Sequence, residues 1–228
     1  RFDQLQGMLR SGQSMQACVH SLRAVPWDQV QRHIAEAHQR GLKLHVHLEE
    51  QPRELAEIKG AYGDHPVRLL LDSQLPVEHI VGVHMTHTPE SQLVEWLERG
   101  ATILPCPLTE GDLGDGVPEL PDLPALRNQL ALGTDSNLRI SMFEEMRRLE
   151  HDQRCRTLRR GALRCGGTSP AEVLWRAAST GGRLALGRSD PGPSLSINQE
   201  HHLLTQGDGS SLLDALVFGG DERVLKGQ

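Results

Sequence analysis

The sequence predicts an α/β fold in which parallel strands are joined by crossover helices. Apolar runs of strand length alternate with segments of helical periodicity along most of the chain, which is the pattern of repeated βα units. Several of the predicted strands also end in a histidine or an aspartate, and enzymes built on parallel βα barrels place their chemistry at such strand ends. The alternation stops near Gly187, so we divide the chain into a barrel portion, residues 1–187, and a tail, residues 188–228.

The composition limits the classes of partner and compartment. The 228 residues carry a formal net charge of -6, which argues against a nucleic acid or an anionic membrane as partner. The four cysteines lack CxxC spacing, so a reducing cytoplasm is the expected compartment. No apolar run approaches the roughly 20 residues that span a bilayer. The chain begins with Arg1 in what reads as the middle of a protein, and we expect it to be a fragment.

The first half of the chain has clear boundary signals. A proline at the first turn, where its missing N–H does no harm, favours helices that begin at Pro26 and Pro52. Thr88 and Pro89 have the pattern of an N-cap and first-turn pair for a helix that Gly100 ends. The remaining expected helices are Phe2–Leu9 and Pro66–Leu71, and the expected strands are Met15–Ser21, Lys43–Leu48 and His79–Met85.

The second half continues the alternation and then changes character. We expect strands at Ala101–Leu104 and Gln129–Thr134, separated by a loop rich in Gly and Asp at Thr109–Gly116 and an irregular proline-rich segment. The expected helices are one carrying Ile140, Phe143, Met146 and Leu149, one at Asp152–Leu163 and one at Ala171–Ser179. The short apolar pieces of the tail, Leu195–Ile197, Leu203–Leu204 and Ala215–Phe218, resemble the strands of a small β appendage.

The stretch Leu42–Gln51, LKLHVHLEEQ, has polar side chains where a buried strand is expected. Alternation along a strand directs His45 and His47 to one side, and Glu49 and Glu50 follow where the strand ends. Because polar groups hidden from water cost free energy unless they find partners, this stretch predicts a site. From this stretch alone, the interpretation of satisfied core or rim residues remains equally open.

Three other predicted strands carry a polar residue at the corresponding end, namely His20, His84 and Asp135. Small residues precede two of them at positions that we expect to face the same side and to leave room: Gly82, Ala131 and Gly133. One strand-end histidine is more often a hydrogen-bonded core residue than a ligand, so the prediction of a single pocket rests on the agreement among four strands. Imidazoles and carboxylates are ordinary zinc ligands and also suit iron or manganese.

With these residues in place, the chain resembles the amidohydrolase superfamily and, within it, the formimidoylglutamate deiminases of histidine degradation. The resemblance covers nearly the whole chain in family order, and its last two motifs are typical of these deiminases more than of the superfamily. The matching motifs are HSLRAV (20–25), HVHLEEQ (45–51), VHMTH (83–87), CPLTEGDLGDG (106–116), GTDSN (133–137), EEMRRLEHDQR (144–154) and LLDALVF (212–218).

The resemblance implies a partial (β/α)8 TIM-type barrel, strands 4 to 8, with the remnant of a C-terminal β-sandwich in residues 188–228. It also implies a zinc-dependent hydrolysis of N-formimino-L-glutamate to N-formyl-L-glutamate and ammonia. One zinc ion per chain would be bound by His47, by Asp135 and by a first-strand HxH pair that is missing from this sequence. The implied partner is a small anionic molecule, and a homodimer is compatible with the family.

The resemblance also implies a role for each matching residue. Glu50 matches the catalytic acid/base, and His84 matches the histidine that hydrogen-bonds the hydrolytic water together with Asp135. His20 and Arg23 match residues that hold the substrate, and the planar fork of an arginine binds carboxylates in a bidentate manner.

Several points depart from this picture or stay open. His45 and His47 could themselves be the first-strand pair, although the following Glu50 and the order of motifs match the fifth strand better. We expect His45, deeper in the barrel, either to support the metal ligands from behind or to pack in the core, and Glu49 to be a solvated rim residue. With two ligands and three strands missing, we expect weak or no activity from this chain. The alternatives are a guanine-type deaminase and an inactive paralogue that serves as a binding or subunit module.

Overall fold

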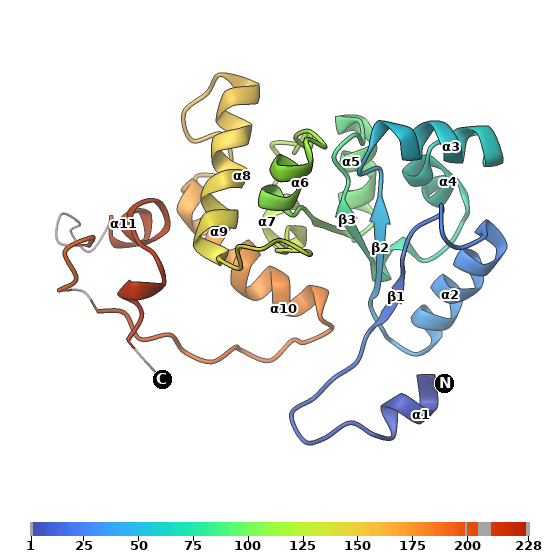
Figure 1. Ribbon diagram of the computed structural model, residues 1–228, viewed down its shortest axis with the longest axis horizontal. Helices are drawn as coiled ribbons and strands as arrows, with labels where there is room; N and C mark the ends of the chain where they lie inside the picture. The colour runs from blue at the N-terminus through green and yellow to red at the C-terminus, as the bar shows by residue number, and fades with distance from the viewer. Residues whose placement is uncertain (1, 199, 205–210, 227–228) are drawn as a thin grey trace.

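Four parallel strands form the centre of the computed structural model, which describes residues 2–198, 200–204 and 211–226. The strands are β1 (Ala17–Val19), β2 (Leu44–Leu48), β3 (Ile80–His84) and β4 (Thr102–Leu104), in that order across the sheet. Every pair is parallel, and Figure 1 shows the helices following one another around the sheet. The predicted α/β class and the partial barrel are therefore confirmed.

The segment after α7 (Leu126–Gln129) continues the sheet through a single bridge, where the sequence predicted a full strand. Leu130 forms a parallel bridge with Ile103, and the amide of Ala131 donates to the Ile103 carbonyl at 2.9 Å. The expected strand Gln129–Thr134 is shorter than predicted because helix α7 (Leu126–Gln129) occupies its start. The edge of the sheet beyond β4 is thus formed by an extended segment that carries Asp135 at its end.

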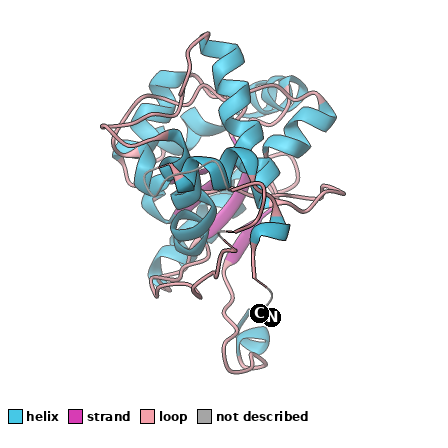
Figure 2. Ribbon diagram, turned by 90° about the vertical axis from the view of Figure 1, so that its left-hand side faces the viewer, coloured by secondary structure: helices cyan, strands magenta, loops and turns pink. Residues whose placement is uncertain are grey.

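Helices that begin at prolines or directly after them cover the outer face of the sheet. They are α2 (Trp27–Gln39), α3 (Pro52–Tyr62), α4 (Pro66–Asp72) and α5 (Glu90–Glu98). Their apolar stripes pack on the outward-facing residues of the strands, so that Ile34, Leu70 and Trp96 are all buried with Val46 and Ile103. Figure 2 shows strands in the interior with helices in front of and around them. The N-terminal α1 (Phe2–Gln6) is shorter than expected.

Three predicted elements are wrong because contacts distant in sequence override the local pattern. The Gly- and Asp-rich segment at Thr109–Gly116 is mostly helical, in α6 (Pro107–Leu113), and ends where Gly114 adopts a φ of 72°. The expected helix at Asp152–Leu163 is not a separate element: its first residues, to Thr157, form the end of one long helix, α8 (Met142–Thr157), and the rest is not helical. Thr88 does not cap α5, because its hydroxyl donates to Glu49 Oε2 at 2.7 Å.

The described part of the tail, beyond residue 187, contains one α-helix and one short 3-10 turn amid turns and coil. The chain runs from α9 (Pro170–Arg176) through a π-helical turn (Ala177–Gly181) to α10 (Gly182–Ala185), and later forms α11 (Leu212–Gly219) and a 3-10 turn, Glu222–Val224. The expected strand Ala215–Phe218 is therefore wrong, whereas Ile197 does form an antiparallel bridge, with Leu225. The division at residue 187 stays a prediction, as does the β-sandwich origin of the tail.

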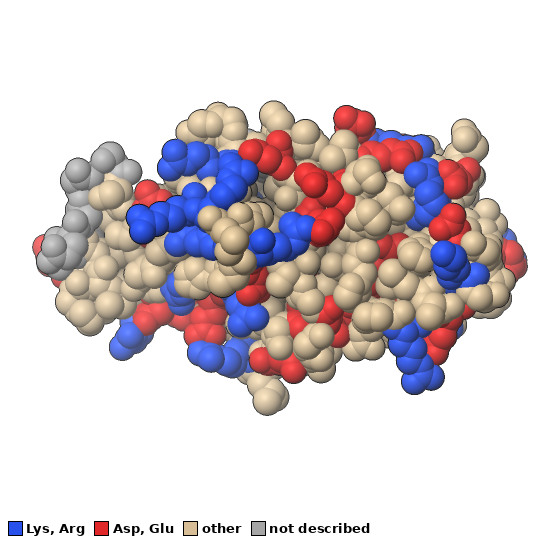
Figure 3. Space-filling view, turned by 90° about the horizontal axis from the view of Figure 1, so that it is seen from above, with Lys and Arg blue, Asp and Glu red and all other residues tan. Residues whose placement is uncertain are grey.

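The surface of the protein carries charges of both signs. Seen from above, acidic and basic side chains adjoin one another, with the basic ones gathered over one part of the face (Figure 3). None of the described helices has the length and apolar character needed to cross a membrane.

The buried carboxylate of Glu49 provides a test of how the strand ends are held. It is fully buried and accepts hydrogen bonds from the Val67 amide at 2.9 Å and from the Thr88 hydroxyl. Glu49→Ala leaves two buried donors unsatisfied, and we expect it to lower the free energy of unfolding by about 2 to 4 kcal/mol. Urea denaturation measures this, with Glu50→Ala as the neighbouring control, which we expect to change the unfolding free energy by less than half as much.

Candidate active site

Three imidazoles lie in a row at the C-terminal ends of the strands. The ring of His20, just after β1, is 5.0 Å from the ring of His47 in β2, and the His47 ring is 5.4 Å from that of His84 at the end of β3. This edge is the end at which enzymes with parallel βα barrels carry out their chemistry. The structure therefore brings together the histidines that the sequence placed at separate strand ends.

The tautomer of His47 follows from its neighbour. Its Nδ1 lies 2.7 Å from the backbone carbonyl oxygen of His20, and a carbonyl can only accept a hydrogen bond. Nδ1 therefore carries the proton, and Nε2 keeps a free lone pair. This arrangement, with one ring nitrogen fixed by a carbonyl, is the usual preparation of a histidine that binds a metal through the other nitrogen.

The side chain of His84 is buried among carboxylates. Its Nδ1 is hydrogen-bonded to Glu110 Oε1 at 3.2 Å, whereas its Nε2 is 3.7 Å from Glu50 Oε1 and 3.9 Å from Asp135 Oδ2. Nε2 is buried and has no hydrogen-bond partner in the described structure. Because a buried polar atom needs a partner, these three groups surround the place of a water molecule or a polar substrate atom.

The charge state of His84 is set by two opposing effects. Burial by itself lowers the pKa of the imidazole, but the hydrogen bond to Glu110 and the negative charges of Glu110, Glu50 and Asp135 outweigh it, so the pKa is raised. The pocket thus stabilises positive charge at its centre.

The route by which His84 enters the pocket differs from the prediction. In the β2–β3 register, Gly82 pairs with Val46, which belongs to the outer core, and a Cβ at Gly82 would meet Met85 and Trp96 on the helix-covered side. The expectation that Gly82 faces the pocket is wrong. By alternation, the side chain of His84 would point outward like position 82, two residues earlier. The left-handed backbone of His84, with a φ of 68°, redirects that side chain.

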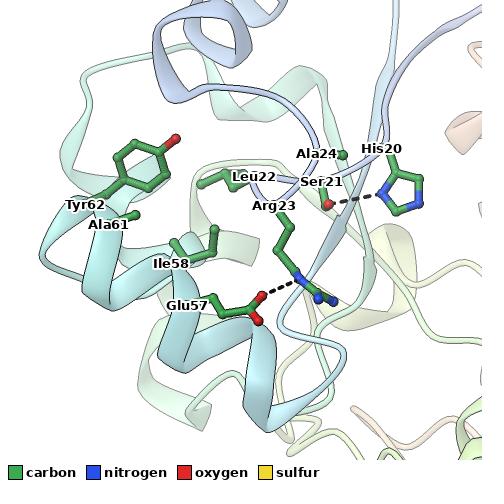
Figure 4. Close-up of a pocket in the computed structure, with 9 residues that line it drawn as sticks. All are labelled: His20, Ser21, Leu22, Arg23, Ala24, Glu57, Ile58, Ala61 and Tyr62. Atoms are coloured by element: carbon green, nitrogen blue, oxygen red, sulfur yellow. Dashed lines mark hydrogen bonds and ion pairs between the residues drawn. The ribbon is translucent and has the colours of Figure 1, made fainter.

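The residues predicted to hold a substrate lie beside the histidines. His20 and Arg23 line a cavity of about 470 Å³ together with Glu57 and Tyr62 of α3 (Figure 4). Arg23 donates from Nε to Glu57 Oε2 at 2.8 Å, which fixes the plane of the guanidinium group, and its two terminal nitrogens have no hydrogen-bond partner among the described residues. His20 Nδ1 lies 3.0 Å from the Ser21 hydroxyl.

Two neighbouring residues of the stretch 42–51 lie outside the pocket. His45 Nε2 is 2.8 Å from the Ala185 carbonyl, deeper in the barrel, which agrees with the expected packing role. Glu49 is fully buried between α4 and the start of α5, so the expectation of a solvated rim residue is wrong.

Comparison with known proteins identifies the family. The model of the amidohydrolase family matches residues 3–196, which is most of the chain. The chain belongs to the amidohydrolase family. A formimidoylglutamate deiminase of Pseudomonas aeruginosa is 31% identical over 226 residues, which are 95% of this chain and 49% of that relative. A 5-methylthioadenosine/S-adenosylhomocysteine deaminase of Syntrophobacter fumaroxidans is 31% identical over 68% of this chain and 35% of its own length.

Solved structures agree with this assignment. An amidohydrolase from Brucella melitensis superposes with a TM-score of 0.81 at 28% identity and covers 98% of this chain and 50% of its own. A zinc-bound adenosine deaminase from Xanthomonas campestris gives a TM-score of 0.79 at 23% identity, which shows the shared fold. The chain spans about half the length of the amidohydrolase relatives it matches most fully.

Within this amidohydrolase site, Glu110 is the residue whose role sequence reasoning missed. It lies in α6, is 2% exposed, and its Oε1 accepts from His84 Nδ1 and also from the Cys106 amide at 2.7 Å. The motif CPLTEGDLGDG contains it, but the segment was interpreted as a loop, and a loop gives no reason to direct an acid inward. An acidic residue one helical turn after a strand end was the available signal.

A second buried acid holds α6 in place. Glu145, in α8, accepts from the Leu108 amide in the first turn of α6 at 3.0 Å and is fully buried. Burial, with smaller effects of neighbouring acids, raises the pKa of Glu145 to about 7. The position of Glu110, and through it that of His84, therefore depends on a contact between α6 and α8.

Replacing Glu110 tests its influence on His84. Glu110→Gln removes the negative charge and the strongest acceptor beside Nδ1 but leaves the ring buried, so we expect the pKa of His84 to fall. An NMR titration of the His84 ring protons measures it, with Asp112→Asn as a control on the same helix. An unchanged His84 titration would show that Glu110 does not set its charge state.

The pKa of Glu145 gives the stability a defined pH dependence. A carboxyl that titrates near pH 7 when folded and near 4.5 when unfolded stabilises the protein below pH 4.5, and this contribution is lost as the pH rises through 7. Glu145 contributes at most about 3 kcal/mol to the free energy of unfolding in this way. Wild type should therefore lose more stability than Glu145→Gln between pH 5 and 8, as measured by urea denaturation. Glu144→Gln, which alters a more exposed neighbour, should keep the wild-type slope.

Proposed function

We propose that this chain forms the C-terminal half of a zinc-dependent deaminase that converts N-formimino-L-glutamate to N-formyl-L-glutamate and ammonia. The observation that carries the proposal is the position of His84 Nε2, buried, unpartnered and within 4 Å of both Glu50 and Asp135. A proton acceptor, a carboxylate ligand and an imidazole facing one point are the groups that hydrolysis of a carbon–nitrogen bond requires.

The donor set fits a zinc ion in part. His47 offers a prepared Nε2, and Asp135 offers a carboxylate whose side chain is about a quarter exposed toward the pocket. His47 and Asp135 would bind the ion, and the resemblance assigns the other two ligands to an HxH pair outside this sequence. A bound zinc ion would supply a hydroxide at neutral pH by lowering the pKa of its water to about 7.

The chain's own residues would position the water and move its proton. His84, held by Glu110, donates or accepts at Nε2 and orients the water together with Asp135. Glu50 takes the proton from the water as it attacks the formimino carbon, and returns it to the nitrogen that leaves as ammonia. The carboxylate 3.7 Å from His84 is close enough to share the same water molecule.

The choice of substrate rests on the cavity beside the histidines and on the Pseudomonas relative. The guanidinium of Arg23, fixed through Nε by Glu57, presents its remaining nitrogens for bidentate binding of a carboxylate. The relative that matches 95% of the chain is a formimidoylglutamate deiminase. A purine substrate would favour aromatic walls, and among the described residues that line this cavity, Tyr62 is the aromatic one.

An assay with defined alternatives tests the proposal. The N-terminal half of the Pseudomonas deiminase, fused ahead of this chain, should restore zinc-dependent release of ammonia and N-formyl-L-glutamate, as followed by NMR, whereas the chain alone should be weakly active or inactive. Glu50→Gln in the fusion should lower kcat by about 10²-fold or more. Arg23→Ala should mainly raise KM, while Arg53→Ala, which alters the exposed second partner of Glu57, should leave both constants nearly unchanged.

Three results would contradict the proposal. Release of formamide would mean that a different bond breaks, and turnover of purines alone would favour the alternative substrate class. Robust turnover by the isolated 228-residue chain that a chelator abolishes would show that its own residues complete the metal site.

A further inference from the structure

A second group of metal-binding side chains lies at the opposite ends of the strands from the candidate active site. His38 is in the last turn of α2, and Glu78 and His79 belong to the 3-10 turn η1 (Val77–His79), which leads into β3. One ligand atom from each of the three lies within 4.8 Å of the others. His38 Nδ1 is 3.6 Å from Glu78 Oε1, and the two imidazole rings are 4.8 Å apart.

The imidazole of His79 is already oriented for a ligand. Its Nδ1 lies 3.1 Å from the backbone carbonyl oxygen of Leu42, so Nδ1 is the donor and Nε2 keeps its lone pair. This is the same arrangement as that of His47 in the candidate active site, where a carbonyl fixes the first nitrogen and frees the second. The turn that carries His79 is held as well, because Lys43 Nζ donates to the Glu78 carbonyl at 2.9 Å.

The remaining two ligands can move the short distance that a metal ion requires. Tetrahedral zinc with bonds of about 2.0 to 2.1 Å places its nitrogen ligands about 3.3 Å apart, which is closer than the 4.8 Å limit of this group. The side chains of His38 and Glu78 are each 47% exposed, so they can rotate without disturbing the core. Their exposure also leaves room for water at the open coordination positions.

The local charges favour a divalent cation. Glu78 supplies a full negative charge, and His38 lies at the C-terminus of α2, where the carbonyl groups give the helix its negative end. The opposing charge is Lys43, whose pKa is lowered by burial, so that the ammonium is already less favoured there than in water. Two imidazoles and one carboxylate suit zinc, nickel or cobalt, and not calcium or magnesium, which prefer oxygen ligands.

We propose that His38, Glu78 and His79 bind one divalent transition-metal ion in a structural site separate from the proposed catalytic centre. The ion would join the end of α2 to the turn before β3, two places about 40 residues apart in the sequence, and would stabilise the folded state by binding to it in preference to the unfolded chain. The proposal is independent of the proposed function, since none of its residues lies at the C-terminal ends of the strands.

The experiment uses the 228-residue chain with His47→Ala and Asp135→Asn, which removes the metal ligands of the candidate active site. Calorimetric titration with zinc and with nickel should show one ion per chain, and the melting temperature should rise with ion concentration. His38→Ala and His79→Ala, each added separately, should weaken the affinity at least about tenfold. His33→Ala, an exposed histidine of α2 outside the group, should leave the affinity unchanged.

NMR signals of the histidine rings distinguish this site from scattered surface binding. Zinc should shift the ring resonances of His38 and His79 and leave those of His33 in place. Two results would overturn the proposal. One is that a chain shown by circular dichroism to be folded does not bind the ion at about 1 mM. The other is that His79→Ala binds the ion with the same affinity as the chain that retains His79. If the double background variant does not fold, the unmodified chain serves, and there His79→Ala should remove one binding event while His47→Ala leaves that event in place.

Discussion

The turns at the C-terminal ends of the strands are the constraint on which the site depends. Glu49, His84 and Asp135 all have positive φ values, of 54°, 68° and 49°, in a region that residues with side chains rarely adopt. Such backbone strain persists only where surrounding contacts over-determine it. At Glu49 those contacts are two buried hydrogen bonds to its carboxylate, and at His84 the contact is the hydrogen bond with Glu110. Two buried acids, Glu49 and Glu110, therefore supply hydrogen bonds that hold these strained turns.

These buried acids connect the two motifs on which the resemblance to formimidoylglutamate deiminases mainly rests. The helix with EEMRRLEHDQR contributes Glu145 to the first turn of α6, the helix that carries Glu110. Two residues along α8, Arg147 donates to the carbonyl oxygens of Val217 and Gly220 at 3.1 and 2.6 Å, and so holds the helix with LLDALVF. A continuous set of contacts thus leads from α11 through α8 and α6 to His84.

Local signals in the sequence were sufficient for much of the fold but not for the direction of every side chain. Prolines and glycines marked the helices around β2 and β3 correctly, because their backbone restrictions act within a few residues. His84 was assigned to the pocket by strict alternation with Gly82, and that argument fails, since Gly82 faces the helices and a left-handed residue redirects His84. His84 does lie beside Glu50 and Asp135, but not for the reason that alternation gave. Alternation cannot foresee such a reversal, and the partner of the redirected side chain, Glu110, lies 26 residues further along the chain.

The prediction of a loop in place of helix α6 was wrong for a related reason. Gly111, Gly114 and Gly116 weaken the helical pattern locally, and the amide at Leu108 finds its acceptor in α8, 37 residues away. A similar separation in sequence, 34 residues, hides the Arg23–Glu57 pair, which the packing of α3 beside the end of β1 brings together. Positions of polar residues at strand ends were predictable, because topology fixes them, whereas the partners that orient those residues come from the tertiary structure.

The charges of the pocket are separated in a way that bears on its substrate. Glu50, Glu110 and Asp135 surround His84 at one end, and the same acids contribute to raising the pKa of the neighbouring Cys106 thiol, after the larger effect of burial. Arg23 lies in the cavity that His20 also lines, where it is paired with Glu57. Under the proposed function, the acids would attract a cationic amidine, and Arg23 would bind a carboxylate of the same molecule. Because a metal ion would also be drawn to the acidic end, the reacting carbon and the ion would be placed together by the same field that orients the substrate.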